Sequence, residues 1–157
     1  MILDRSKSLQ ETYAPNGICF GCGCKNSKGL QIQSYVNNNK IIATWEANSH
    51  HEAFPGVLNG GIIGSLLDCH SNWAAAYHIM LDQDLDQTPC TVTAEYNVKL
   101  KRPTPSNKPL DIIANLSKID KNKAWIESSI LVNNKIYATC SGLFVAVGED
   151  HPAYHRW

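Results

Sequence analysis

The sequence predicts an α+β fold in which an antiparallel sheet of about six strands wraps around one long central helix. Three observations favour it. Two β-like runs flank an Asn-rich turn between Leu30 and Ala47, helical apolar periodicity runs from Asn59 to about Met80, and four more β-like runs follow Pro89. A long helix with a largely apolar surface can bury that surface only against the sheet.

Composition predicts a single domain spanning residues 1–157. The chain has 157 residues and is 43% hydrophobic, which suffices for one core but not for two ordinary domains. Fourteen Lys and Arg balance fourteen Asp and Glu, so no global field recruits nucleic acid or an anionic membrane. We expect neither as a partner.

The first ten residues, MILDRSKSLQ, lack an apolar signal core, and no apolar run approaches the ~18 residues that span a bilayer. We therefore expect a cytoplasmic protein. Six cysteines are present, at positions 19, 22, 24, 69, 90 and 140. In the reducing cytosol they are expected to be free thiols.

The N-terminal third is expected to be an irregular arm followed by a hairpin and a loop. Residues 1–28 mix charge with Pro and Gly and predict an arm with one short helix. The runs LQIQSYV and KIIATWEA flank Asn37–Asn39, where Asn tolerates the left-handed backbone of a tight turn. Residues 48–58 contain Pro55 and Gly56 and are expected to form a loop.

The helix is predicted from Asn59 to about Met80, with Asn59 as its N-cap. Apolar residues recur there at helical spacing: Ile62, Ile63, Leu66, Leu67, Trp73, Ala74 and Tyr77. Gly60, Gly61 and Gly64 are poor helix formers, and their presence at a helix start indicates close approach by a backbone or a ligand.

Four strands are predicted after the helix, over Cys90–Lys101, Leu110–Ile119, Trp125–Val132 and Ile136–Val147. Polar turns separate them, including Lys121–Lys123 and Asn133–Asn134. Residues 148–157 are expected to be a surface extension.

One stripe of the predicted helix carries the residues able to do chemistry: Gly61, Gly64, Ser65, Asp68 and Asn72. An arbitrary Asp more often caps a helix or faces water. Here the glycines leave room for an acyl group above the helix. The unpaired N–H groups of its first turn can stabilise a developing oxyanion.

These residues resemble a known family. FPGVLNGGIIGSLLDCHSNWAAA (54–76) resembles the HGG…D signature of the PaaI-like hot-dog thioesterases, and CFGCGCKNSKGL (19–30) resembles the leader of many members. YNVKLKRPTP (96–105) looks like the family's strand ending in an Arg-Pro turn. The resemblance covers about residues 19–147. It implies a hot-dog fold and an acyl-CoA thioesterase.

The resemblance implies catalytic roles for Asp68, Gly61, Asn59 and Thr93. Asp68, nine residues after Asn59, would activate water. The Gly61 N–H would hold the thioester carbonyl. Thr93 matches an assisting hydroxyl from the facing subunit, with Thr91 on the same strand face as the fallback.

Two positions depart from the family pattern. Asn59 replaces the histidine of the motif, and Ala53 stands where some relatives carry a water-orienting Asn. His50 or His51 could compensate, although loop histidines beside a site are more often bystanders.

Gly60 at the helix start, and Ser65 and Asn72 on the stripe, are predicted to bind substrate. Coenzyme A is anionic, and the resemblance places Arg102, Lys123 and the neighbouring Lys121 near its nucleotide. Trp45, Trp73 and Tyr77 are expected in the core rather than in an acyl pocket. The resemblance also implies a homodimer or homotetramer in which two chains build the substrate tunnel.

Other functions stay open at this point. Asn59 and Ala53 motivate a non-catalytic acyl-CoA or lipid-binding hot-dog module. A dehydratase would customarily use a His near the helix start, which is lacking. Cys19, Cys22 and Cys24 could form a zinc knuckle if His50, His51, Cys69 or His70 supplied a fourth ligand. Cys69 is expected to pack in the core. We expect no metal and no cofactor.

Overall fold

The computed structural model describes residues 6–154. Residues 1–5 of the predicted arm and 155–157 of the predicted extension lie outside the described residues. The elements, in chain order, are α1 (Leu9–Tyr13), β1 (Tyr35–Asn37), β2 (Lys40–Trp45), a 3-10 helix η1 (Ser49–His51), β3 (Glu52–Phe54), β4 (Val57–Leu58), α2 (Gly60–Asp82), β5 (Thr91–Leu100), β6 (Leu110–Asp120), β7 (Lys123–Val132) and β8 (Lys135–Ala146).

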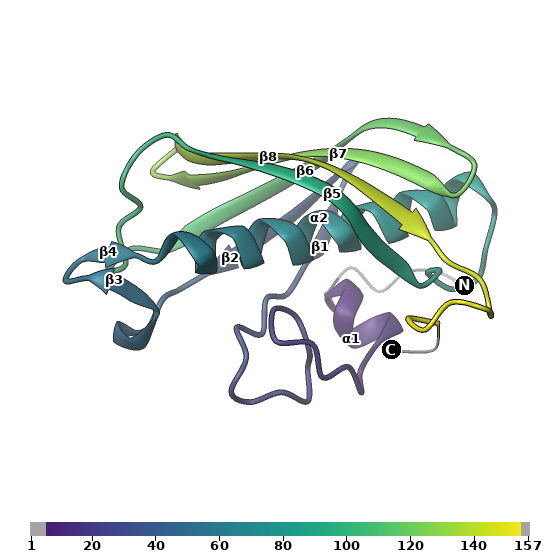
Figure 1. The fold of residues 1–157 in the computed structure, drawn as a ribbon, viewed down its shortest axis with the longest axis horizontal. Helices are drawn as coiled ribbons and strands as arrows, with labels where there is room; N and C mark the ends of the chain where they lie inside the picture. Colours follow the sequence, from purple (N-terminus) through teal and green to yellow (C-terminus); the bar gives the residue numbers. More distant parts are fainter. Residues whose placement is uncertain (1–5, 155–157) are drawn as a thin grey trace.

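Six strands form one antiparallel sheet in the order β1-β2-β6-β7-β8-β5. Figure 1 shows this sheet arching over α2, with the N-terminal arm on the opposite side of the helix. The predicted α+β class, the strand number and the single long helix are confirmed. The arrangement is the hot-dog fold.

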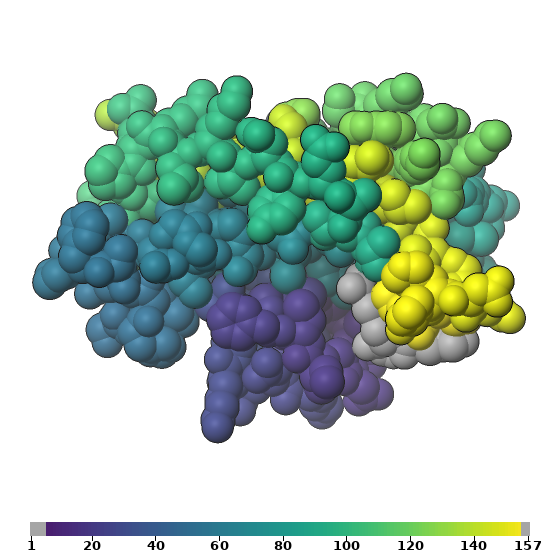
Figure 2. All heavy atoms as spheres, viewed as in Figure 1, coloured from purple at the N-terminus to yellow at the C-terminus, as the bar shows by residue number. Residues whose placement is uncertain are grey.

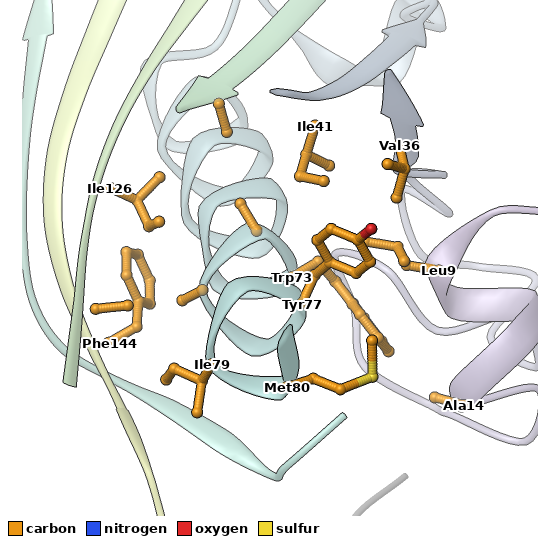
Figure 3. Close-up of a cluster of buried hydrophobic side chains, with 14 residues drawn as sticks. Leu9, Ala14, Val36, Ile41, Trp73, Tyr77, Ile79, Met80, Ile126 and Phe144 are labelled. Atoms are coloured by element: carbon orange, nitrogen blue, oxygen red, sulfur yellow. The ribbon is translucent and has the colours of Figure 1, made fainter. Parts of the chain in front are cut away.

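The helix packs against the sheet on one side and against the arm on the other. Figure 3 shows Ile126 and Phe144 of the sheet on one side of α2, while Trp73 and Tyr77 extend toward Leu9 of the arm. Trp45, Trp73 and Tyr77 are all buried, as expected for core residues, but Trp73 also lines a cavity.

The turns follow the predicted chemistry. Asn38 adopts φ 54°, and Asn133 and Asn134 adopt φ 49° and 63°, so Asn takes the left-handed backbone in both hairpins. Lys121 also has positive φ, 55°, in the turn between β6 and β7.

Two predictions about the N-terminal third are wrong in detail. The first hairpin strand begins at Tyr35 rather than Leu30, because the Leu30 and Ile32 N–H groups donate to the Phe20 and Gly21 carbonyls of the arm. The predicted loop 48–58 contains η1 and the small β3-β4 hairpin. Within residues 6–154, no helix is both long and apolar enough to cross a membrane.

Candidate active site

The start of α2 is capped by the residue that the sequence predicts. Asn59 Oδ1 accepts hydrogen bonds from the N–H groups of Gly61 (2.8 Å) and Ile62 (3.3 Å). These two bonds satisfy donors that a helix start otherwise leaves unpaired. The Gly61 N–H therefore already has an acceptor within the chain.

Asp68 lies two turns further along α2 and contacts β5. Its Oδ1 accepts a hydrogen bond from Thr93 Oγ1 at 2.6 Å, and both side chains are half-buried. The resemblance implied a hydroxyl from the facing subunit, whereas this contact lies within one chain. Four residues closer to the C-terminus of the helix, Asn72 Oδ1 accepts a hydrogen bond from Thr91 Oγ1.

β5 runs antiparallel to α2 along the α2 stripe, the helix face that carries Gly61, Gly64, Ser65, Asp68 and Asn72. A β-bulge between Thr93 and Glu95 shifts the strand by one residue, so the side chains facing the helix change from odd to even numbers. Beyond the bulge, a Cβ on Gly64 would lie 4.0 Å from the Tyr96 hydroxyl, and one on Gly60 would lie 3.3 Å from Leu100 Cδ1. The helix glycines therefore leave room for β5 side chains.

A cavity of about 170 Å³ opens beside Asp68. Its walls come from α2, β5 and the arm, and it is lined by Ala14, Gly17, Ile18, Cys19, Cys22, Gly23, Asp68, Cys69, Asn72, Trp73, Val92 and Thr93. Figure 2 shows the purple arm packed beneath the helix and β5. We call this hollow the Asp68 cavity.

A second hollow of about 410 Å³ lies at the start of α2. Gly60 lines it together with Ala53, Leu100 and Arg102. We call it the helix-start groove. Within one chain, Gly60 and Asp68 thus open onto different hollows.

Arg102 and Lys123, the two side chains predicted to bind the nucleotide, lie far apart. Arg102 lies at the helix-start groove, where its Nε donates to the Ile136 carbonyl at 3.1 Å. Lys123 lies beside the other end of α2, since Gln83, the C-cap of that helix, donates to the Lys121 carbonyl at 2.9 Å. A helix of 23 residues spans about 35 Å, so Arg102 and Lys123 flank opposite ends of the molecule.

Ser65 and the loop histidines have local partners. Ser65 Oγ donates to the Gly61 carbonyl at 3.0 Å. His51 Nδ1 accepts from the Asn48 N–H at 3.0 Å, and its carbonyl accepts from the Asn59 N–H at 3.0 Å. Burial, with the neighbouring His50, lowers the pKa of His51. His51 thus fixes the entry to α2 in its neutral form.

The cysteines are arranged differently from the predicted knuckle. Cys19 and Cys22 of the arm meet Cys69 of α2, with all three sulfur atoms within 4.8 Å of one another. Cys24 lies apart and contacts the Gln33 side chain. The hydrogen bond with Cys22, followed by that with Cys69, lowers the pKa of Cys19, while the bond with Cys19 raises the pKa of Cys22 to about 12.

His70 faces away from this cluster. It is fully buried, its Nδ1 accepts from Ser34 Oγ at 2.9 Å, and its Nε2 donates to the Ile41 carbonyl at 3.0 Å. Sequence reasoning missed this network and the Asn72–Thr91 pair, since each joins residues far apart in the chain.

Comparison with known proteins places this fold among thioesterases. No protein-family model matches the chain. A thioesterase-superfamily protein from Shewanella loihica superposes with a TM-score of 0.63 at 26% identity, over 74% of this chain and 91% of the other. The Escherichia coli PaaI protein from the phenylacetic acid degradation operon gives 0.64 at 17% identity, over 76% and 81%.

Two curated relatives are similar along most of the chain. The acyl-coenzyme A thioesterase THEM4 of Bos taurus is 22% identical over 148 residues, covering 92% of this chain and 57% of the bovine protein. THEM4 of Rattus norvegicus is 20% identical over 151 residues, covering 94% and 61%. The chain thus spans less than two thirds of the length of these relatives.

Proposed function

We propose that this chain hydrolyses acyl-CoA thioesters with Asp68 as the general base. The observation that carries the proposal is the Asp68–Thr93 hydrogen bond at the wall of the Asp68 cavity. A carboxylate two turns inside a largely buried helix is rare unless it is paired or has a chemical task. The likeness to acyl-coenzyme A thioesterases supports the substrate class.

The chemistry needs only water and the thioester. Asp68 removes a proton from water, and the resulting hydroxide attacks the thioester carbonyl carbon. The C–S bond of the tetrahedral intermediate then breaks, and the leaving thiolate takes the proton that Asp68 removed from water, which regenerates the carboxylate. The products are a carboxylic acid and free CoA thiol. A positioned general base contributes about 10²–10⁴-fold to such a reaction.

Gly61 is the proposed oxyanion donor because its N–H lies in the first turn of α2, at the positive end of the helix dipole. In this structure that N–H donates to Asn59 Oδ1. A bound carbonyl oxygen must therefore share or displace the cap, at a cost of about 1 kcal/mol. Asn59 thus controls access to the donor.

The separation of the two groups supports a homodimeric site. Seven residues of helix place Gly61 and Asp68 about 10 Å apart along the axis. Their neighbourhoods open onto different hollows of one chain. We propose that the helix start of one chain and Asp68 of another act on the same thioester, so that two chains form each site.

Arg102 is the proposed contact for the anionic nucleotide of CoA. It is exposed at the helix-start groove, beside Gly60. A guanidinium at this mouth can bind phosphate through two parallel hydrogen bonds. Lys123, at the other end of the helix, cannot share that phosphate within the same chain.

The second candidate function is an acyl-CoA or lipid-binding module without turnover. The Asn59 cap on the Gly61 N–H favours it, because an occupied donor weakens the oxyanion site. Ala53, which lines the helix-start groove, supplies no polar group that could orient water.

Steady-state hydrolysis of short, long and aromatic acyl-CoAs by the wild type separates these functions. Release of CoA thiol is followed with a thiol reagent, and binding of a non-hydrolysable thioether analogue is measured in parallel. Turnover of one substrate class supports the hydrolase. Binding of the analogue without turnover of any thioester supports the module and overturns the hydrolase.

A further inference from the structure

Hydrolysis by Asp68 makes no use of the three-thiol cluster formed by Cys19, Cys22 and Cys69. Cys19 and Cys22 are three positions apart on the arm, and Cys69 comes from the middle of α2. We propose that this cluster is a binding site for Zn²⁺, which fastens the arm to α2 at the wall of the Asp68 cavity.

The sulfur positions fit tetrahedral coordination. With Zn–S bonds of about 2.3 Å, neighbouring sulfurs of a tetrahedral site lie about 3.8 Å apart. Cys19 Sγ and Cys69 Sγ are 3.8 Å apart, and all three sulfurs lie within 4.8 Å of one another. Zn²⁺ binding requires the third sulfur, Cys22 Sγ, to come to the same spacing.

Two glycines allow the sulfurs to approach. A Cβ on Gly21 would collide with Cys69 Sγ, and a Cβ on Gly23 would lie 2.5 Å from the Cys19 backbone nitrogen. The Gly23 N–H also donates to the Cys19 carbonyl at 2.8 Å, closing the turn. Gly21 therefore admits Cys69, and Gly23 shapes the turn that presents Cys19 and Cys22.

N–H donors reach two of the three sulfurs, those of Cys19 and Cys22, as they do around metal-bound thiolates. The backbone N–H groups of Gly21 and Cys22 donate to Cys19 Sγ. Trp73 Nε1 donates to Cys22 Sγ at 3.3 Å. Such bonds stabilise negative charge on sulfur, which a thiolate ligand carries and a neutral thiol does not.

The three thiolate ligands determine which ion the cluster prefers, and they leave a fourth coordination position to fill. Three thiolates favour a thiophilic cation such as Zn²⁺ over Mg²⁺ or Ca²⁺, which prefer oxygen. Among the residues that the structure describes, no fourth His, Cys, Asp or Glu joins the cluster. All three cysteines line the Asp68 cavity, so its open side offers the fourth position to water.

The test loads reduced full-length protein with Zn²⁺ and, separately, with Co²⁺, then removes unbound metal. Metal analysis should find one Zn²⁺ per wild-type chain, and Co²⁺ should give thiolate-to-metal charge-transfer absorption. Cys19→Ser and Cys69→Ser should lose both signals. Cys24→Ser is the matched control, because it changes a neighbouring thiol outside the cluster and should keep both.

Thermal unfolding gives an independent readout. Zn²⁺ should raise the Tm of the wild type and Cys24→Ser but not that of Cys19→Ser, whose exposed side chain can change without loss of the fold. The proposal is overturned if the wild type retains no Zn²⁺ or if Cys19→Ser retains as much.

Discussion

Asp68 and Thr93 show how a charged side chain can be kept inside a mostly apolar helix. The Thr93 hydroxyl donates to the carboxylate and holds it at the wall of the Asp68 cavity. A hydrogen bond to a charged group contributes about 1.5–3 kcal/mol. Thr93 is therefore a positioning residue in the proposed mechanism, acting through Asp68.

We expect Thr93→Val to lower kcat about tenfold with little change in KM, because losing roughly 1.4 kcal/mol of orientation raises the barrier by that factor. Valine has the same shape but no hydroxyl. Thr93→Ser, which restores the donor, should stay near the wild-type rate. Equal rates for all three proteins, measured with a saturating acyl-CoA, would remove Thr93 from the mechanism.

The proposed oxyanion donor is the backbone N–H of Gly61, so it is tested by a substitution that removes this N–H. Gly61→Pro removes the N–H at a position in the first helical turn, where proline is tolerated. Its kcat should fall about 10²-fold, the scale found for one oxyanion donor. Gly61→Ala keeps the N–H, and its Cβ would meet Asn59 Oδ1 at 3.0 Å, so the cap side chain must shift slightly and kcat should fall far less than in Gly61→Pro. Parallel losses in both variants would contradict the proposed donor.

At the scale of elements, the sequence predicts the helix and the last four strands well. Their periodicities are long and uniform, and Asn, Gly and Pro mark the turns between them. The β5 bulge was not predictable, because alternation through Thr93 and Tyr96 shows no insertion until pairing with β8 is known. The predicted start of the first hairpin strand at Leu30 was wrong for a similar reason, because the backbone groups of that segment pair with the arm.

The candidate site likewise has features that local sequence patterns predict and features that depend on the tertiary fold. Asp68, Asn59 and Thr93 lie in elements with clear local patterns, so their places were predictable. The meeting of Cys69 with Cys19 depends on how the arm folds back onto α2, and a helical wheel cannot show it. The separation of Arg102 from Lys123 likewise depends on the whole sheet.

His70 of α2 bonds Ser34, just before β1, and Ile41 of β2, and it makes stability depend on pH. Burial lowers the pKa of His70 from 6.5 to about 4. The unfolded chain therefore takes up this proton first as pH falls. The stabilisation from the neutral ring is complete above about pH 6.5 and is lost progressively between pH 6.5 and 4.

We expect the free energy of unfolding of the wild type to fall between pH 7.5 and 5 by about 2 kcal/mol more than that of His70→Gln. Burial also lowers the pKa of His51 and His78, so the difference between the two proteins isolates His70. Urea unfolding at each pH measures it. Identical pH dependence in both proteins would contradict a neutral, buried His70.

At the scale of the whole molecule, β5 leaves one edge of the sheet open. β5 is an edge strand, and Tyr96 and Leu100 on it are 46% and 56% exposed. Long edges with apolar side chains are usually paired or covered. Joining two sheets through β5 would also bring two copies of the α2 stripe close together, as the proposed shared site requires.

Leu100→Lys should weaken the dimer at least about tenfold, because pairing would bury an ammonium without a partner. Leu81→Lys is the matched control, since Leu81 is also 56% exposed but lies on α2, away from this edge. Sedimentation equilibrium gives both dissociation constants. An unchanged dimer in Leu100→Lys would rule out pairing through β5.

The most direct test of the account compares Asp68→Asn with the wild type on the acyl-CoA that the wild type hydrolyses fastest. Asparagine keeps the size of the side chain and its polar contact with Thr93 but cannot take a proton from water. The account predicts a kcat at least about 100-fold lower, with binding of the thioether analogue retained. A variant that turns over at the wild-type rate would show that Asp68 is not the base and would contradict the central claim.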